Sequence, residues 1–208
     1  MNHNPTYEYA GIPLLLPITR SLIIDIYAGK ENVITKDEIN REIEERHFAL
    51  RGESASRDDR SRYVSNSLGQ LPNARHKGRG KGLSYWKINY LELGTGNKWV
   101  YCFYFELDQY RAIRDKKWCW KCNIGRTGND PFNRIRDQTG GVPKAPIISL
   151  LIRTDDEQTL ERYIHKILKE RGRHLTNTDT KEDFLTCPSE VARIFFDSPH
   201  FCGKRIPL

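Results

Sequence analysis

The 208-residue sequence predicts an α+β protein built from two small domains. Residues 11–88 show helical periodicity first and strand-like alternation last, whereas residues from 97 onward begin with strands and then alternate strands with helices. Between them, residues 91–98 are rich in glycine and weakly patterned. We therefore expect one domain over residues 1–92 and a second over residues 97–208.

Two helices are expected first. Apolar residues from Ile18 to Tyr27 recur at helical spacing, and this pattern stops near Gly29. Thr35 and Glu38 have the spacing of a capping box, in which the two residues cap the same helix start with reciprocal hydrogen bonds. The second helix is therefore expected to begin directly after Thr35.

A third helix is expected after the polar stretch that follows residue 50. Val64, Leu68 and Leu71 share one face of this helix and form its buried stripe. The opposite face carries side chains that can bond to base edges in a major groove of DNA. The candidates for this contact are Arg62, Ser65 and Asn66.

A basic, glycine-rich segment follows the third helix and ends in a strand-like aromatic run. Residues 73–87 contain five lysines or arginines and no acidic residue. Such a segment after three helices has the order of a winged helix-turn-helix, so we expect it to be the wing and to contact phosphates. Its charge and glycine content also fit a solvated flexible loop. The residues assigned to phosphate contacts are Arg75, Lys77, Arg79 and Lys81.

Three strands are expected in the second domain. Residues 99–105 are dense in aromatic and β-branched side chains on both faces, as in a central strand. Residues 117–124 alternate between two faces, and residues 146–153 form a third, strongly apolar strand.

Two helices are expected among these strands. Asn129-Asp130-Pro131 is a helix start signal, and the short helix it opens runs through Gln138. Thr154 and Glu157 have the spacing of another capping box, which opens a helix that ends at Gly172. The resulting β-β-α-β-α order predicts a small domain with a central antiparallel sheet.

The charge of the chain favours a polyanionic partner. Lysine and arginine total 34 against 27 acidic residues, a formal charge of +7, and the sequence pI is about 9.2. No run of eighteen apolar residues is present, and the first residues lack the pattern of a signal peptide. We therefore expect a soluble, cytoplasmic protein that binds double-stranded DNA and does not associate with a membrane.

The odd number of cysteines in a chain with no export signal argues against a disulfide framework. Small buried thiols are the favoured interpretation. The spacing of Cys119 and Cys122 leaves a zinc site as an alternative, with Cys187 and Cys202 as distant ligands, and with it a zinc-stabilised RNA-binding module.

Five short elements of the second domain occur in a suggestive order. They are Trp99-Val100-Tyr101, Asn123-Ile124-Gly125, Arg134, the helix residue Glu161, and Glu182-Asp183-Phe184. Together with the β-β-α-β-α order, they make residues 97–185 resemble the core of the GIY-YIG nucleases, in particular the phage-associated and restriction-type branch. One departure is an insertion of residues 108–116 between the first two motifs.

The resemblance implies a metal-dependent endonuclease that hydrolyses phosphodiester bonds in DNA. It assigns Tyr101 to the attacking water, Arg134 to the scissile phosphate and Glu161 to one Mg²⁺ or Mn²⁺ ion. Taken singly, each residue also has an ordinary structural interpretation, in the core, on the solvated surface or on a helix flank. A restriction or phage-defence role is the implied context, and cleavage of both strands would require a homodimer or successive cuts.

A second departure is Asn123, which stands where the second motif of these nucleases carries a tyrosine. An amide can orient water or a phosphate oxygen but cannot act as a phenolate base. Tyr101 then carries the base chemistry, assisted by Lys121 or His165, while Arg126 provides a second phosphate contact. Asn123 also supports the alternative of a DNA-binding regulator in which the nuclease fold is weakened or inactive.

Overall fold

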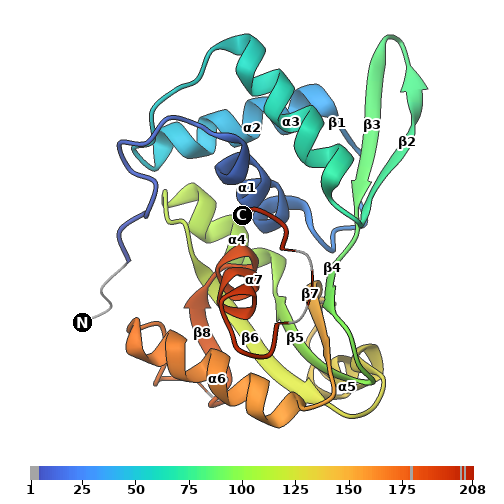
Figure 1. Ribbon diagram of the computed structural model, residues 1–208, viewed down its shortest axis with the longest axis vertical. Coiled ribbons are helices and arrows are strands. Elements are labelled where there is room, and N and C mark those ends of the chain that lie inside the picture. The colour runs from blue at the N-terminus through green and yellow to red at the C-terminus, as the bar shows by residue number, and fades with distance from the viewer. Residues whose placement is uncertain (1–4, 179, 202, 204) are drawn as a thin grey trace.

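The computed structural model describes residues 5–178, 180–201, 203 and 205–208, and it is an α+β structure with two sheets (Figure 1). No helix in these ranges is long and apolar enough to cross a membrane. Its N-terminal part consists of α1 (Leu16–Tyr27), β1 (Ile34–Thr35), α2 (Lys36–Ala49), α3 (Arg57–Gln70), β2 (Ala74–Gly80) and β3 (Leu83–Ile88).

The three N-terminal helices form where the sequence predicts them. The capping box at the start of α2 is confirmed, since Thr35 Oγ1 accepts from Glu38 N at 3.2 Å and Glu38 Oε2 accepts from Thr35 N at 2.9 Å. The predicted stripe of α3 is also confirmed, because Val64, Leu68 and Leu71 are all buried.

The segment predicted as a wing folds as an antiparallel hairpin of β2 and β3. Its sheet has the order β1-β3-β2. The hairpin turn is formed by Lys81 and Gly82, which both have positive φ angles (50° and 78°), as a two-residue type I′ turn requires. Figure 1 shows the hairpin standing beside α3 at the edge of the N-terminal part.

The second sheet has the strand order β4-β7-β5-β6-β8. All its pairings are antiparallel except that of the edge strand β4, which runs parallel to β7. The stretch in which we expected a domain boundary therefore includes a strand of the second sheet. The strands are β4 (Leu91–Gly94), β5 (Lys98–Tyr104), β6 (Trp120–Thr127), β7 (Ile147–Thr154) and β8 (Asp183–Thr186).

Four helices accompany this sheet. The insertion between the first two motifs forms α4, and α5 packs on the face of the sheet that carries the buried cluster of Tyr101, Phe103, Ile135 and Leu151. Helices α6 and α7 pack with the larger core on the opposite face. The bounds are α4 (Glu106–Arg114), α5 (Pro131–Gln138), α6 (Glu157–Glu170) and α7 (Pro188–Phe196).

The expected capping box at the start of α6 is wrong. Thr154 is the last residue of β7 and lies two positions before the cap of α6, and its Oγ1 accepts a hydrogen bond from Asp156 N at 3.2 Å instead. Asp156 is the cap instead, and its Oδ1 accepts a hydrogen bond from Thr159 N at 3.0 Å. The expected end is nearly right, since α6 ends at Glu170 and Gly172 follows with a φ of 68°.

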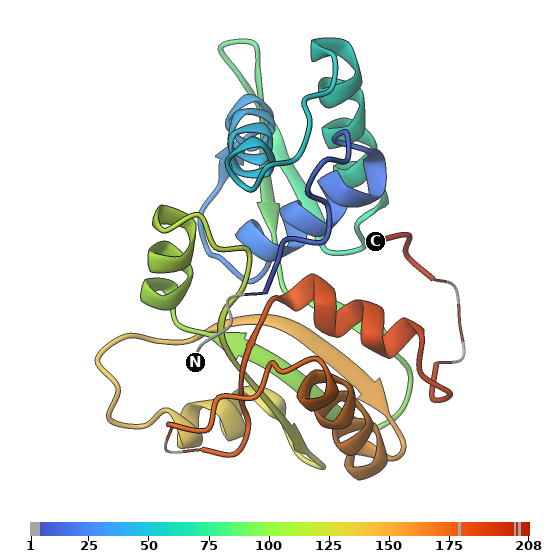
Figure 2. The ribbon, with the colours of Figure 1, turned by 90° about the vertical axis from the view of Figure 1, so that its left-hand side faces the viewer.

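One continuous core joins the N-terminal helices to the second sheet. Figure 2 shows α7 lying between α1 and the sheet. Asp25 of α1 is buried there, and it accepts hydrogen bonds from Ser189 N (2.7 Å) and Ser189 Oγ (2.8 Å) at the start of α7. Burial raises the pKa of Asp25 to about 6, while the bonds from Ser189 act in the opposite sense. The two parts are therefore packed against each other rather than tethered by a linker.

Candidate active site

Tyr101 lies in the middle of β5, directly opposite Gly125 of β6. The tyrosine ring crosses the backbone of Gly125 so closely that a Cβ atom added there would lie 2.6 Å from Tyr101 Oη. No side chain fits at that distance. The glycine of the second motif is therefore required by the position of the tyrosine of the first.

The Tyr101 hydroxyl is held by a short chain of hydrogen bonds. It donates to Gln138 Oε1 of α5 at 2.6 Å, and Gln138 Nε2 donates to Glu182 Oε2 at 3.1 Å. Burial raises the pKa of Tyr101 to about 12 and the Glu182 carboxylate adds to this, whereas Arg134 lowers it. The phenol is therefore protonated at neutral pH and acts as a donor.

Arg134 is exposed on α5, one helical turn before Gln138. Its guanidinium forms no ion pair with any carboxylate in the described ranges. It lies close enough to Tyr101 for its charge to act on the pKa of that phenol. A free guanidinium next to a buried hydroxyl can hold a phosphate with two parallel donors.

Glu161 projects from α6 and binds Arg126, which lies near the end of β6. Arg126 Nε donates to Glu161 Oε2 at 3.0 Å, and Arg126 Nη1 lies 3.6 Å from Glu157 Oε1. Glu157 also pairs with Lys98 at 3.0 Å. Burial raises the pKa of Glu161, and the charge of Arg126 opposes the rise. Arg126, expected to be a phosphate contact, is here the partner of the candidate metal ligand.

Two of the predicted residues have bonds directed into the protein. His165 lies one turn after Glu161, as expected, but its Nε2 bonds to the backbone oxygen of Ile124 at 2.8 Å, and burial lowers its pKa. Asn123 is only 6% exposed, and its Nδ2 donates to Asp183 Oδ1 at 3.1 Å. These contacts fix α6 and β8 against β6.

Lys121 also binds the strand next to it. Its Nζ lies 2.9 Å from Asp183 Oδ2, and Asp183 is buried on β8. Lys121 and Asn123 thus share one carboxylate between them. Lys121 has no contact with Tyr101 among those described, so the structure places it at the β6–β8 edge.

The described geometry can be compared with known families. Residues 99–197 match the T5orf172 domain. This domain is related to the GIY-YIG nucleases, in agreement with the resemblance of the motifs. No curated protein and no solved structure matches the chain.

The T5orf172 domain begins in β5 and ends just after α7, so it includes every residue of the candidate site. Helices α1–α3, the hairpin and the edge strand β4 lie outside the match. Gln138 is the site residue that the motifs did not include, whereas Glu182 belongs to the fifth motif but was given no role there. Gln138 is separated from Arg134 by four residues, and this helical spacing is the one signal that could have indicated it.

Glu161 is the candidate oxygen ligand for a divalent metal ion in the T5orf172 domain. Glu161 uses Oε2 for Arg126, and its Oε1 forms no hydrogen bond within the described ranges. Glu182 lies close enough to raise the pKa of both Tyr101 and Glu161. A free carboxylate oxygen is the kind of ligand that Mg²⁺ and Mn²⁺ prefer.

Among the described residues, the cysteines are buried thiols, as favoured, and do not form the zinc set that was the alternative. The four described cysteines are free and buried, and Cys202 lies outside the described residues. Cys119 and Cys187 approach Glu190 rather than Cys122. Glu190 already accepts bonds from Arg171 and Arg173 at 3.0 and 3.3 Å, and these cations oppose a metal ion there.

The predicted DNA-contacting residues of the N-terminal part are all exposed, and they lie on α3 and the hairpin. Figure 1 shows these elements at one end of the long axis of the molecule, with α5 and α6 of the T5orf172 domain toward the other. On α3 they are Arg62, paired with Asp59 at 2.6 Å, and Ser65 and Asn66. On the hairpin they are Arg75, Lys77, Arg79 and Lys81.

Proposed function

We propose that this protein is a metal-dependent endonuclease that hydrolyses phosphodiester bonds in double-stranded DNA. The observation that carries the proposal is the arrangement of Tyr101, Arg134 and Glu161. They come from β5, α5 and α6, and the charges of Arg134 and Glu161 both act on the Tyr101 phenol. The match to the T5orf172 domain supports the same reaction class.

Each of the three side chains has a distinct task. Tyr101 orients the attacking water, with its hydroxyl fixed by Gln138. Arg134 binds the scissile phosphate and stabilises the negative charge that develops on it. Glu161 holds one Mg²⁺ or Mn²⁺, which supplies Lewis-acid charge to the phosphate.

Arg126 is expected to change its binding partner when substrate binds. In the structure it neutralises Glu161 and contacts Glu157. With substrate bound, the Arg126 guanidinium would turn to the phosphate, and Glu161 would be free to hold the metal ion. Arg126 then becomes the second phosphate contact.

The N-terminal part serves as a winged helix-turn-helix that holds the duplex. Three helices followed by a hairpin, with the sheet order β1-β3-β2, support this assignment. Helix α3 enters the major groove with Arg62, Ser65 and Asn66, and the hairpin contacts phosphates. The hairpin is a paired two-stranded element, which favours a wing over a flexible loop.

A restriction or phage-defence role fits a separate DNA-holding part joined to a small cutting domain. Each chain carries one candidate site and so cuts one strand at a time. Two chains in a dimer, or two successive events, account for cleavage of both strands.

The second candidate is a DNA-binding regulator with an inactive nuclease fold. Asn123 is the observation that favours it, because this residue replaces the second tyrosine and is buried against Asp183. A buried amide bonded in this way takes no part in activating water.

Incubation of supercoiled plasmid with the purified protein separates the two candidates. The nuclease predicts nicked or linear product with Mg²⁺ or Mn²⁺ and none with EDTA. The regulator predicts DNA binding without cleavage, and a folded protein that binds but never cuts plasmid or phage DNA with modified bases would exclude the nuclease.

A further inference from the structure

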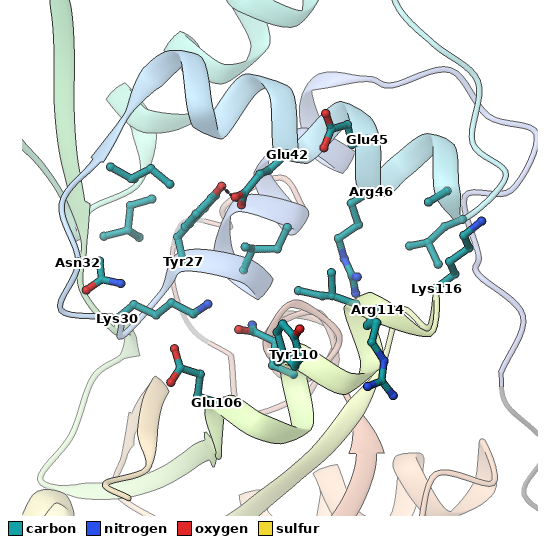
Figure 3. Close-up of a pocket in the computed structure, with 17 residues that line it drawn as sticks. Tyr27, Lys30, Asn32, Glu42, Glu45, Arg46, Glu106, Tyr110, Arg114 and Lys116 are labelled. Atoms are coloured by element: carbon teal, nitrogen blue, oxygen red, sulfur yellow. Dashed lines mark hydrogen bonds between the residues drawn. The ribbon is translucent and has the colours of Figure 1, made fainter.

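A cavity of about 580 Å³ lies between the N-terminal part and the second sheet. Its walls come from α2, from α4 and from the segment that follows α1, and Figure 3 shows these elements around it. The volume falls within the range of small-molecule binding sites, which is roughly 300–1,000 Å³. None of the residues assigned to the nuclease reaction lines it.

Aromatic and aliphatic side chains form much of the wall. Tyr110 of α4 is 62% exposed, and Ile113 of the same helix is 37% exposed. Tyr27 lies across the cavity with its hydroxyl bonded to Glu42 (Figure 3). The exposed ring of Tyr110 provides a face on which a flat aromatic group can stack.

A buried guanidinium also lines the cavity. Arg46 of α2 is 7% exposed, and its Nη2 donates to the backbone oxygens of Lys117 (2.9 Å) and Trp118 (3.4 Å). Its Nε is buried without any hydrogen-bond partner among the described residues. No described carboxylate lies within ion-pair distance of this guanidinium. The Asp25 carboxylate acts on this charge from beyond ion-pair distance, and an anion that reached the guanidinium would further offset the cost of burying it.

A second cation approaches the same space. Figure 3 shows Lys30 and Arg46 pointing into the cavity, with Tyr110 between them. Lys30 forms no ion pair in the described part of the chain, and burial lowers its pKa. Gln109 Nε2 donates to the backbone oxygen of Asp25 (2.7 Å) and to Tyr104 Oη (3.0 Å), which leaves Gln109 Oε1 as an acceptor in the wall.

We propose that this cavity binds a single nucleotide, with the base stacked on Tyr110 and the phosphate held by Arg46 and Lys30. The ring of Tyr110 would stack on a flat group, and Arg46 and Lys30 would hold the anionic group attached to it. The carboxylates of Glu42, Glu45 and Glu106 line the same cavity, so the anionic group has to bind at the two cations. Helix α4 supplies the stacking side and α2 supplies the guanidinium, so a bound nucleotide would bridge the N-terminal part and the T5orf172 domain.

Isothermal titration calorimetry with the full chain tests the proposal. We expect nucleoside monophosphates to bind, the matching nucleosides to bind at least tenfold more weakly, and inorganic phosphate to bind weakly. The Tyr110→Ala protein should lose about tenfold in affinity, because stacking on one aromatic ring contributes about 1–3 kcal/mol per base. Lys30→Met should also weaken binding, and it remains informative if variants of Arg46 do not fold.

Two control variants define the site. Phe48→Ala removes an exposed aromatic ring on α2 that does not line the cavity. This variant should bind the nucleotide with the affinity of the unchanged protein. Glu161→Ala should also bind normally, which separates this site from the proposed nuclease centre. Absence of binding at millimolar nucleotide, or binding that survives both Tyr110→Ala and Lys30→Met, would overturn the proposal.

The nucleotide can come from solution or from an extruded position in a DNA strand. Competition between a labelled monophosphate and a single-stranded oligonucleotide distinguishes these sources. Displacement that requires Tyr110 indicates a nucleotide still linked in a strand, and lack of displacement indicates a free nucleotide. Either result agrees with stacking of the base on Tyr110 and binding of the phosphate by Arg46 and Lys30.

Discussion

At the scale of single residues, the contact between Tyr101 and Gly125 determines whether the phenol can be in place. We expect Gly125→Ala to displace the tyrosine ring, because the new Cβ would lie 2.6 Å from Oη. Overpacking of this kind costs about 1–3 kcal/mol. The melting temperature and the rate of plasmid cleavage should both fall.

Gly128 provides the matched control for that change. A Cβ added at Gly128 meets no atom within 4 Å, although this residue lies only three positions further along the chain. Gly128→Ala should therefore retain stability and activity. Equal effects of the two substitutions would contradict the role given to the Tyr101–Gly125 contact.

The Tyr101 hydroxyl has a separate prediction. Tyr101→Phe removes only the group that bonds to Gln138, so the fold should persist while cleavage falls about a hundredfold or more. The cleavage rate of the Phe variant measures the fall in activity, and circular dichroism checks that the variant is folded. Full activity of the Phe variant would leave Tyr101 as a core residue.

At the scale of elements, the β2–β3 hairpin is expected to bind phosphates. Replacing its four basic residues by glutamine should weaken DNA binding and reduce the slope of log K against log salt by roughly three to four, since each phosphate contact contributes about 0.9. Fluorescence anisotropy at several salt concentrations measures both effects. The residues are Arg75, Lys77, Arg79 and Lys81.

A control for charge alone is available on α6. Lys166 and Lys169 are exposed there, and replacing both by glutamine removes charge far from the hairpin. The slope should then stay near its original value. A hairpin variant that binds like this control would rule out the wing assignment.

Elements with strong local signals could be predicted from the sequence, and those that depend on tertiary pairing could not. The capping box at Thr35 was predicted correctly because both partners are local. The same spacing at Thr154 misled, because α6 begins only at Glu157 and Asp156 is its cap. Strand β4 was missed because four residues beside glycines are too few to establish a strand pattern. Its pairing with β7 is a tertiary contact that the sequence does not reveal.

The site was predictable to a similar extent. The motifs assign Tyr101, Arg134 and Glu161, and the structure places Arg134 and Glu161 close enough to Tyr101 for their charges to act on its pKa. The inward bonds of Asn123 and His165 could not be predicted, because they depend on where β8 and α6 pack against β6. The chain from Tyr101 through Gln138 to Glu182 depends on three separate elements for the same reason.

At the scale of the whole molecule, Asp25 couples the N-terminal part to the second sheet and should make stability depend on pH. Its pKa in the folded protein is about 6, above the ordinary value of 3.8. The folded state therefore holds this proton more tightly, and the stabilisation is fully present below pH 4 and lost as the pH rises through 6. The expected loss is on the order of 2 kcal/mol.

Urea unfolding of the unchanged protein and of Asp25→Asn from pH 4 to pH 7 checks this. The stability of the unchanged protein relative to the variant should fall across that interval and level off above it. A difference that stays constant with pH would show that Asp25 does not titrate in the folded protein as described.

The most direct measurement is metal-dependent cleavage of supercoiled plasmid by the unchanged protein, Glu161→Ala and Glu170→Ala. Glu170 is an exposed acid on the same helix, and among the described residues it pairs only with Lys166, at 3.9 Å, so it controls for charge and helix content. We predict that Glu161→Ala binds DNA but cuts at least about a hundredfold more slowly, whereas Glu170→Ala cuts normally. Equal cleavage by all three proteins would contradict the proposed active site.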